Sequence, residues 1–196
     1  EHGTYIMNSK DLRAVAHVER LTRMGVHSLK IEGRTKSYYY CARTAQVYRK
    51  AIDDAAAGKP FDPQLLETLE GLAHRGYTEG FLRRHTHDDY QNYEYGFSVS
   101  ERQQFVGEFT GERKGELAAV LVKNKFTVGD SLELMTPQGN INFTLEQMEN
   151  AKGEAMPVAP GDGYTVWMPV PEDIDLNYAL LMRNFASEST RNPHAK

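Results

Sequence analysis

The densest group of chemically capable side chains is the run Lys-Ile-Glu-Gly-Arg-Thr-Lys-Ser at residues 30–37. Arg34 offers a planar fork of N–H donors and Lys36 a point charge, which together suit a carboxylate or a phosphate. Glu32 can orient Arg34 or act as a general base, so it is the candidate catalytic residue. A solvent-exposed turn whose charges are merely hydrated is the alternative. Four residues of the run are predicted to bind a substrate: Lys30, Arg34, Lys36 and Ser37.

A second polar turn, Asn8-Ser9-Lys10-Asp11, follows the first predicted strand. Both turns are predicted to connect the end of a strand to the start of a helix. Parallel α/β folds bind ligands at this edge of the sheet, and the free N–H groups of the helix N-termini also point there. Because consecutive βα turns lie side by side, we expect Ser9 and Arg34 to face one ligand. Ser9 is therefore a further predicted substrate-binding residue.

Two basic islands, Arg113-Lys114 and Lys123-Asn124-Lys125, lie in the otherwise acidic second half of the chain. Phe126, beside two lysines, could stack on a nucleobase while the lysines hold phosphates. The sequence leaves open the alternative that Phe126 belongs to a core and that the lysines flank a strand. The candidate nucleic-acid-binding residues are Arg113, Lys114, Lys123, Lys125 and Phe126.

The other motifs in the sequence give little indication of a catalytic or metal-binding site. The run His85-Thr86-His87-Asp88 has metal-ligating residue types but no thiolate partner and no His-Glu-x-x-His pattern, so we interpret it as a polar linker and predict no metal site. Cys41, the only cysteine, is interpreted as a small buried hydrophobe, and one thiol cannot hold a cysteine-ligated zinc ion or iron–sulfur cluster. The sequence lacks Gly-x-Ser-x-Gly, a P-loop and Gly-x-Gly-x-x-Gly.

The elements that position the two polar turns are predicted within residues 1–58, as strand–helix–strand–helix. The strands are Thr4–Met7 and Val26–Ile31. The first helix is capped by Asn8, has Asp11 near its N-terminus and ends at Gly25. The second begins at Ser37 or Thr35, runs to about Ala57, and is predicted to bury the face that carries Tyr38, Cys41, Ala45, Tyr48 and Ile52.

Residues 59–92 read as a helical connector, with Asp62 capping a helix over Pro63–His74 and the run Arg83–Asp89 as the best domain boundary. Residues 93–183 change to short strands separated by turns, which predicts a small antiparallel β-barrel, and residues 184–196 form a polar tail. Tyr178–Met182 is expected to close the last edge. The other predicted strands are Phe105–Phe109, Leu117–Val122, Ser131–Met135, Asn140–Leu145 and Tyr164–Val170.

Composition limits the class of protein. The 196 residues are 40% hydrophobic and 26% charged, which is typical of a folded globular chain, and the longest aliphatic run is far shorter than the roughly 20 residues of a bilayer span. No secretion signal opens the chain, so a cytoplasmic location is expected. The net charge is −4, but residues 10–50 hold ten Lys or Arg against three acids, a net of +7. Such a segment can attract an anion; two domains with differently solvated faces are the alternative.

Several of these motifs together resemble the collagenase-like peptidase family U32. The matches extend over nearly the whole chain: Asn8–Leu12, Ser28–Arg34, Lys36-Ser37-x-Tyr39, Tyr48–Asp53, Arg75-Gly76-x-Thr78-x-Gly80-Phe81, Lys123–Phe126, Gly129-Asp130 and Met135-Thr136-Pro137-x-Gly139. The resemblance implies a mixed α and β fold in which the last βα units of a TIM-like barrel precede a small β-barrel. It also implies that this chain is the C-terminal part of a longer protein, whose cysteine cluster, holding an iron–sulfur cluster, lies upstream.

The resemblance further implies a role in tRNA processing. One branch of the family is implicated in prephenate-dependent formation of 5-hydroxyuridine at the wobble position of tRNA. The expected partners are therefore tRNA, prephenate or a similar small anion, and the upstream catalytic part, whereas this chain alone is expected to be inactive. The alternatives are a peptidase or its substrate-binding part, and a non-catalytic interaction module. Because two βα units cannot close a barrel, we also expect self-association through residues 1–58.

Overall fold

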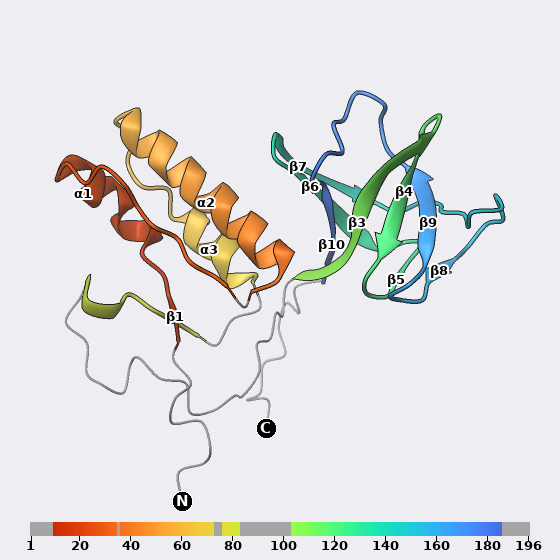
Figure 1. Ribbon diagram of the computed structural model, residues 1–196, viewed down its shortest axis with the longest axis horizontal. Helices are drawn as coiled ribbons and strands as arrows, with labels where there is room; N and C mark the ends of the chain where they lie inside the picture. Colours follow the sequence, from red (N-terminus) through yellow and green to blue (C-terminus); the bar gives the residue numbers. More distant parts are fainter. Residues whose placement is uncertain (1–9, 35, 73–75, 83–102, 186–196) are drawn as a thin grey trace, which may run out of the picture. The chain divides into compact units, whose positions relative to one another are not determined.

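The computed structural model describes residues 10–34, 36–72, 76–82 and 103–185. The chain forms two compact units, Glu1–Glu101 and Arg102–Lys196, and each is described here by itself (Figure 1). The predicted strand Thr4–Met7, the cap Asn8, the boundary run 83–89 and the tail from residue 186 lie outside the described residues. None of the described helices is long and apolar enough to cross a membrane.

The first helix of unit 1 begins later than predicted. A 3₁₀ turn, η1 (Val15–His17), leads into α1 (Val18–Arg23), and Gly25 ends the helix with a φ of 84°, as its position predicted. Asp11 is not in the first turn of this helix. It lies in β1 (Asp11–Leu12), which pairs in parallel with β2 (Tyr77–Thr78).

The predicted strand Val26–Ile31 is wrong, because these residues join no β-ladder among the described parts of unit 1. A strand is stabilised by its neighbours, and the sheet described in this unit holds only β1 and β2. The side chains of Val26 and Ile31 are accordingly 43% and 50% exposed.

The longest helix, α2 (Tyr38–Ala56), confirms the predicted cap, since the Tyr40 N–H donates to Ser37 Oγ at 3.2 Å. The predicted buried face is wrong for its first turns: Tyr38 is 74% exposed, and Cys41 and Ala45 are exposed. The buried side carries Tyr39, Arg43, Thr44, Val47, Ala51 and Asp54. The helix packs against α1, η1 and α3 (Gln64–Glu70) (Figure 1).

The helix α3 occupies the middle of the range predicted for it. Asp62 Oδ1 accepts a hydrogen bond from the Gln64 N–H at 3.0 Å, as expected of a residue that caps this helix. Leu65, Leu69 and Leu72 are buried, in agreement with the predicted apolar stripe. A 3₁₀ turn, η2 (Gly80–Leu82), follows β2.

Unit 2 contains a large antiparallel sheet, which confirms the predicted antiparallel strands, whereas closure of the strands into a small β-barrel stays a prediction, because β7 and β9 stand at opposite ends of the sheet. Its strands are β3 (Gln103–Lys114), β4 (Leu117–Val122), β6 (Ser131–Thr136), β7 (Gly139–Thr144), β9 (Thr165–Pro169) and β10 (Leu180–Asn184). They lie in the order β7-β6-β10-β3-β4-β9, and a separate pair is formed by β5 (Phe126–Thr127) and β8 (Val158–Ala159). The predicted final strand is not at an edge, because β10 lies between β6 and β3.

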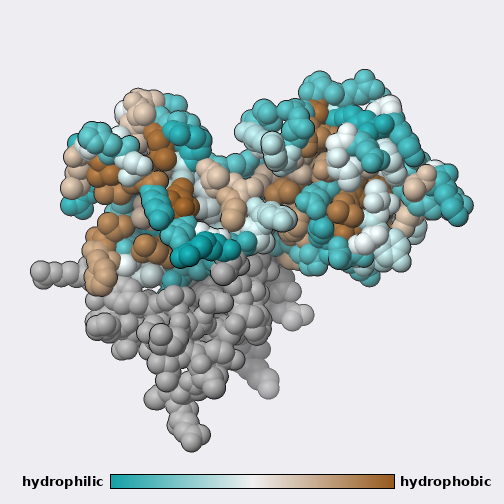
Figure 2. Space-filling model, in the orientation of Figure 1, coloured by the Kyte–Doolittle hydropathy of each residue, from teal (hydrophilic) through white to brown (hydrophobic). Residues whose placement is uncertain are grey.

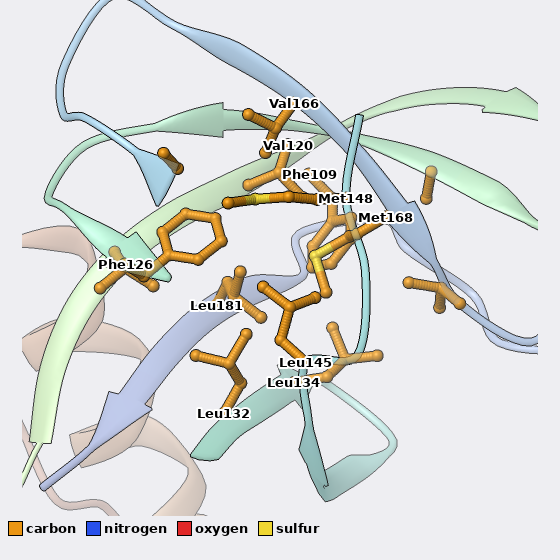
Figure 3. Close-up of a cluster of buried hydrophobic side chains, with 14 of the residues drawn as sticks. Phe109, Val120, Phe126, Leu132, Leu134, Leu145, Met148, Val166, Met168 and Leu181 are labelled. Atoms are coloured by element: carbon orange, nitrogen blue, oxygen red, sulfur yellow. The ribbon is translucent and has the colours of Figure 1, made fainter. Parts of the chain in front are cut away.

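The core of unit 2 lies on the inner face of this sheet. Figure 3 shows side chains from β4, β6, β9 and β10 converging on one cluster, with Phe126 of β5 beside them. The register places Leu132 and Leu134 of β6 opposite Phe143 and Ile141 of β7, so alternate residues of the hairpin point to the core. Phe143 packs against the cluster, whereas Ile141 is 43% exposed where the sheet ends.

Candidate functional site

A groove of about 570 Å³ in unit 1 gathers part of the predicted site. One wall is the segment 28–33, the other is the side of α2 that carries Tyr40, Cys41, Thr44, Ala45 and Tyr48, and residues 11–14 with parts of α1, α3 and β2 complete the lining. Figure 2 shows apolar and strongly hydrophilic side chains next to one another on the visible face of this unit. An apolar pocket with a few convergent polar groups is the usual form of a small-molecule or cofactor site.

The polar centre of the groove is a three-residue cluster. Lys36 Nζ donates to both carboxylate oxygens of Asp11, at 2.8 and 2.7 Å, and the Tyr40 hydroxyl donates to Asp11 Oδ2 at 2.9 Å. The Lys36 ammonium also lies 4.6 Å from the centre of the Tyr40 ring. Burial, with the neighbouring Asp11 carboxylate, raises the pKa of Tyr40 well above its usual range, so the phenol stays protonated and acts as a donor.

The cluster changes the role predicted for Lys36. The Lys36 side chain is 22% exposed and its ammonium already faces a carboxylate, so its charge is compensated before any ligand arrives. Arg34 is 87% exposed and its Nε lies 2.7 Å from Glu32 Oε1, while Lys30 Nζ lies 3.5 Å from Glu32 Oε2. Glu32 pairs with both exposed cations of the run, Arg34 and Lys30, and its predicted catalytic role stays a prediction.

The remaining members of the predicted anion site have different positions. Ser37 caps α2 and directs its side-chain oxygen to a backbone N–H. Ser9 lies outside the described residues, so its proximity to Arg34 stays a prediction. Of the predicted residues, Lys30, Glu32 and Lys36 line the groove.

Sequence reasoning missed several residues of the groove. Asp11 was placed in the second polar turn and in the first turn of a helix capped by Asn8, and Tyr40, Thr44 and Tyr48 were not singled out for chemistry. The Ala14 N–H donates to the Tyr48 hydroxyl at 2.9 Å, which ties α2 to the segment after β1, and burial raises the pKa of Tyr48. Cys41 also lines the groove with an exposed thiol, which corrects its interpretation as a buried hydrophobe.

The basic islands of unit 2 serve largely structural contacts. The Arg113 guanidinium donates to the carbonyl oxygens of Val170, Pro171 and Ile174, at 3.0, 3.2 and 2.9 Å. Lys114 Nζ lies 4.1 Å from the Trp167 ring centre. These two cations hold the ends of the sheet and the loop that follows β9.

The other island has one exposed cation. Lys123 Nζ lies 3.1 Å from Glu108 Oε1 and 3.9 Å from Asp162 Oδ1, whereas Lys125 is exposed and forms no ion pair with another described residue. Phe126 is 0% exposed and belongs to the hydrophobic cluster (Figure 3). A fully buried ring cannot stack on a base, so the prediction for Phe126 is wrong and the core alternative holds.

The residues present do not suit a metal cluster. An iron–sulfur cluster needs several thiolates, and this chain supplies the single thiol of Cys41. Within the parts of the chain that the structure describes, no three His, Cys, Asp or Glu side chains gather as metal ligands would. The run 85–88 lies outside those parts.

Both units match models of known protein families. The family model described as peptidase family U32 matches residues 1–92, and the one described as peptidase family U32 C-terminal domain matches residues 101–183. The chain is 90% identical over all 196 residues to tRNA hydroxylation protein P of Escherichia coli K12, and 73% identical over the same length to the protein of that name from Haemophilus influenzae. It covers 43% of each, so it spans less than half the length of these curated relatives.

More distant relatives have other names. A collagenase of Porphyromonas gingivalis is 23% identical over 177 residues, which are 87% of this chain and 42% of that protein. The crystal structure of a U32 peptidase C-terminal domain from Geobacillus thermoleovorans has 24% identity and a TM-score of 0.37, and the match covers 42% of this chain and 92% of that one. With the two family models spanning nearly all of its sequence, the chain belongs to peptidase family U32.

Proposed function

We propose that this chain is the C-terminal portion of a tRNA-hydroxylating enzyme. The observation that carries the proposal is the 90% identity over all 196 residues to a protein named for tRNA hydroxylation. The modification is proposed to be prephenate-dependent 5-hydroxyuridine formation at the wobble position, in the cytoplasm.

Unit 1 is proposed to supply one wall of the substrate site. Arg34 and Lys30 are the exposed cations beside the groove, and they would meet a carboxylate of prephenate or a phosphate of tRNA. Residues 1–58 would complete a TIM-like barrel with the upstream part of the longer protein, which would also hold the iron–sulfur cluster. Unit 2 would form the small β-barrel and contact RNA through Lys125 or pack against the catalytic part.

The apolar side chains left exposed in unit 1 support this arrangement. Met24 and Val26, which lie outside the groove, are 68% and 43% exposed. Without the upstream part, we expect the 196-residue chain to self-associate through this surface. Sedimentation velocity should show a concentration-dependent shift that Val26→Ser reduces; a strictly monomeric wild-type chain at high concentration would refute the expectation.

The experiment that tests the function is nucleoside analysis of tRNA from cells that lack the full-length protein. We expect 5-hydroxyuridine to be lost from the tRNA of these cells. The full-length gene should restore it, whereas a gene that lacks the segment corresponding to residues 1–196 should not. Unchanged hydroxylated nucleosides in the deletion strain would reject it.

A peptidase remains the second candidate, because a relative is named a collagenase. Cleavage that survives repurification and is lost with Glu32→Gln would favour it. A non-catalytic interaction module would show neither activity.

A further inference from the structure

One buried polar atom in the groove has no hydrogen-bond partner. Thr44 lines the groove and is 9% exposed, yet its Oγ1 makes no hydrogen bond within the described part of the protein. A helical threonine hydroxyl can instead donate to the carbonyl four residues earlier. Thr22 and Thr68 do so here, to Val18 O at 2.9 Å and Gln64 O at 3.0 Å. An unsatisfied hydroxyl is unfavourable in the ligand-free protein, and it marks a position where a ligand atom would be stabilised.

Each cation along the groove has a carboxylate neighbour. Lys36 faces Asp11, Arg13 pairs with Glu70, and Lys30 and Arg34 share the single carboxylate of Glu32 at the rim. The groove therefore presents hydrogen-bonding groups and dipoles to its contents, with little net charge. Such a site suits a neutral ring, because a multiply charged anion would need an uncompensated cation.

Aromatic and aliphatic side chains form most of the remaining lining. Tyr40, Tyr48 and Tyr77 contribute three phenol rings, and burial raises the pKa of Tyr77 as well, so it stays neutral. Lys30, 85% exposed, stands at the rim. A flat ring against this wall, attached to a phosphate near the Lys30 ammonium, matches the chemistry of one nucleotide.

We propose that the groove binds an unstacked nucleobase of single-stranded RNA and that Thr44 Oγ1 is the hydrogen-bond partner of that base. The inference rests on the proposed function, since a tRNA substrate supplies the base. It differs from the anion site predicted at residues 30–37, because it assigns the base to the groove and leaves only the backbone phosphate to the cation at its rim.

The first test measures the cost of the unsatisfied hydroxyl. Thr44→Val keeps the shape of the side chain and removes the hydroxyl, so the thermal unfolding midpoint of the ligand-free chain should rise by about 4–8 °C. Thr22→Val is the matched control, because its hydroxyl is hydrogen-bonded, and its midpoint should fall or stay unchanged. A lower midpoint for Thr44→Val would overturn the inference, since it would show that the hydroxyl has a partner in the protein.

The second test locates the base. A seven-nucleotide single-stranded RNA with one 4-thiouridine is irradiated with the full 196-residue chain, and the crosslinked peptide is identified by mass spectrometry. We expect a crosslink within residues 28–48 that Thr44→Val weakens about fivefold to tenfold and Thr22→Val leaves unchanged. Crosslinks confined to other residues, or equal yields from both variants, would overturn the inference. The nucleoside analysis of cells lacking the full-length protein is independent of these results, so a failed crosslink rejects the groove assignment without rejecting tRNA hydroxylation.

Discussion

Replacing Asp11 by alanine should destabilise unit 1 selectively. The Asp11 carboxylate accepts hydrogen bonds from the Lys36 ammonium and the Tyr40 hydroxyl, and the two charged side chains are only 12% and 22% exposed. Asp11→Ala would leave a mostly buried ammonium without a counter-charge and a phenol without its acceptor. We therefore expect a lower free energy of unfolding. Replacing one partner of an exposed ion pair in the same unit should have a smaller effect, because water can solvate the charge that is left.

The magnitude follows from how far the pair is buried. Removing one partner of a fully buried pair costs about 3–5 kcal/mol, whereas exposed pairs contribute about 0–1 kcal/mol. Because the Asp11–Lys36 pair lies between these limits, we expect about 2–3 kcal/mol, or roughly 10–20 °C in the unfolding midpoint of a unit of this size. The matched control is Asp53→Ala, since Asp53 pairs with Arg49 and both side chains are 62% exposed.

The two units can be followed separately. The helices α1, α2 and α3 all belong to unit 1, so circular dichroism at 222 nm reports mainly on this unit, whereas fluorescence of the single tryptophan, Trp167, reports on unit 2. Asp11→Ala should lower the urea midpoint of the first signal and leave the second unchanged. Asp11→Ala/Lys36→Met should recover part of the loss, because no charge is then left unpaired. A loss no larger than that of Asp53→Ala would refute the reasoning.

Three further predictions concern charge. In the full-length protein, Arg34→Lys should lower tRNA hydroxylation on the order of tenfold, because the guanidinium fork is lost while the charge remains, and wild-type nucleoside levels with Arg34→Ala would place the site elsewhere. Lys125→Glu should weaken tRNA binding and lower its salt slope by about one unit, more than Lys123→Glu does, because Lys123 already faces two carboxylates; equal affinities in filter binding would remove unit 2 from the RNA interface. The hydrogen bond from Lys50 lowers the pKa of Asp54 below its ordinary 3.8, so Asp54→Asn should destabilise the protein at neutral pH, and this difference in stability should shrink as the pH falls below about 4; a difference of the same size at pH 7 and pH 2 in urea titrations would contradict this.

The helix α2 shows which features local sequence determines. Its start depends on Ser37, whose side chain accepts a hydrogen bond from a residue three positions later, and its end on Gly58, which adopts a φ of 71°. Both signals lie next to the boundary they set, so both boundaries were predictable. The buried face depends on α1 and α3 instead, and α2 has apolar residues on more than one side. Periodicity alone therefore selected a face that carries Cys41 and Ala45, which are exposed.

The candidate site likewise combines residues that are adjacent in the sequence with residues that only the fold brings together. The run 30–37 was found because its residue types are adjacent in sequence, and Lys30, Glu32 and Lys36 do line the groove. Tyr40 could have been considered with the run 30–37, because it lies in the first turn of α2, only three residues after the cap Ser37. Asp11 was placed in the neighbouring polar turn, but its bond to Lys36 was not predictable, because the two residues are 25 positions apart and Asp11 lies in β1, which pairs with β2, instead of in a helix.

Folding also reduces the net positive charge with which the basic segment 10–50 can attract RNA. The net charge of +7 over residues 10–50 counts only acids in that window, but Arg13, Arg49 and Lys50 pair with acids that lie beyond it. Over the described residues of unit 1, eleven Lys or Arg stand against nine Asp or Glu, a net of +2. At physiological ionic strength charges more than about 8 Å apart are largely screened, so the exposed cations closest to the groove decide local attraction. Those are Lys30 and Arg34, which is why a backbone phosphate is expected at the rim of the groove rather than spread along the segment.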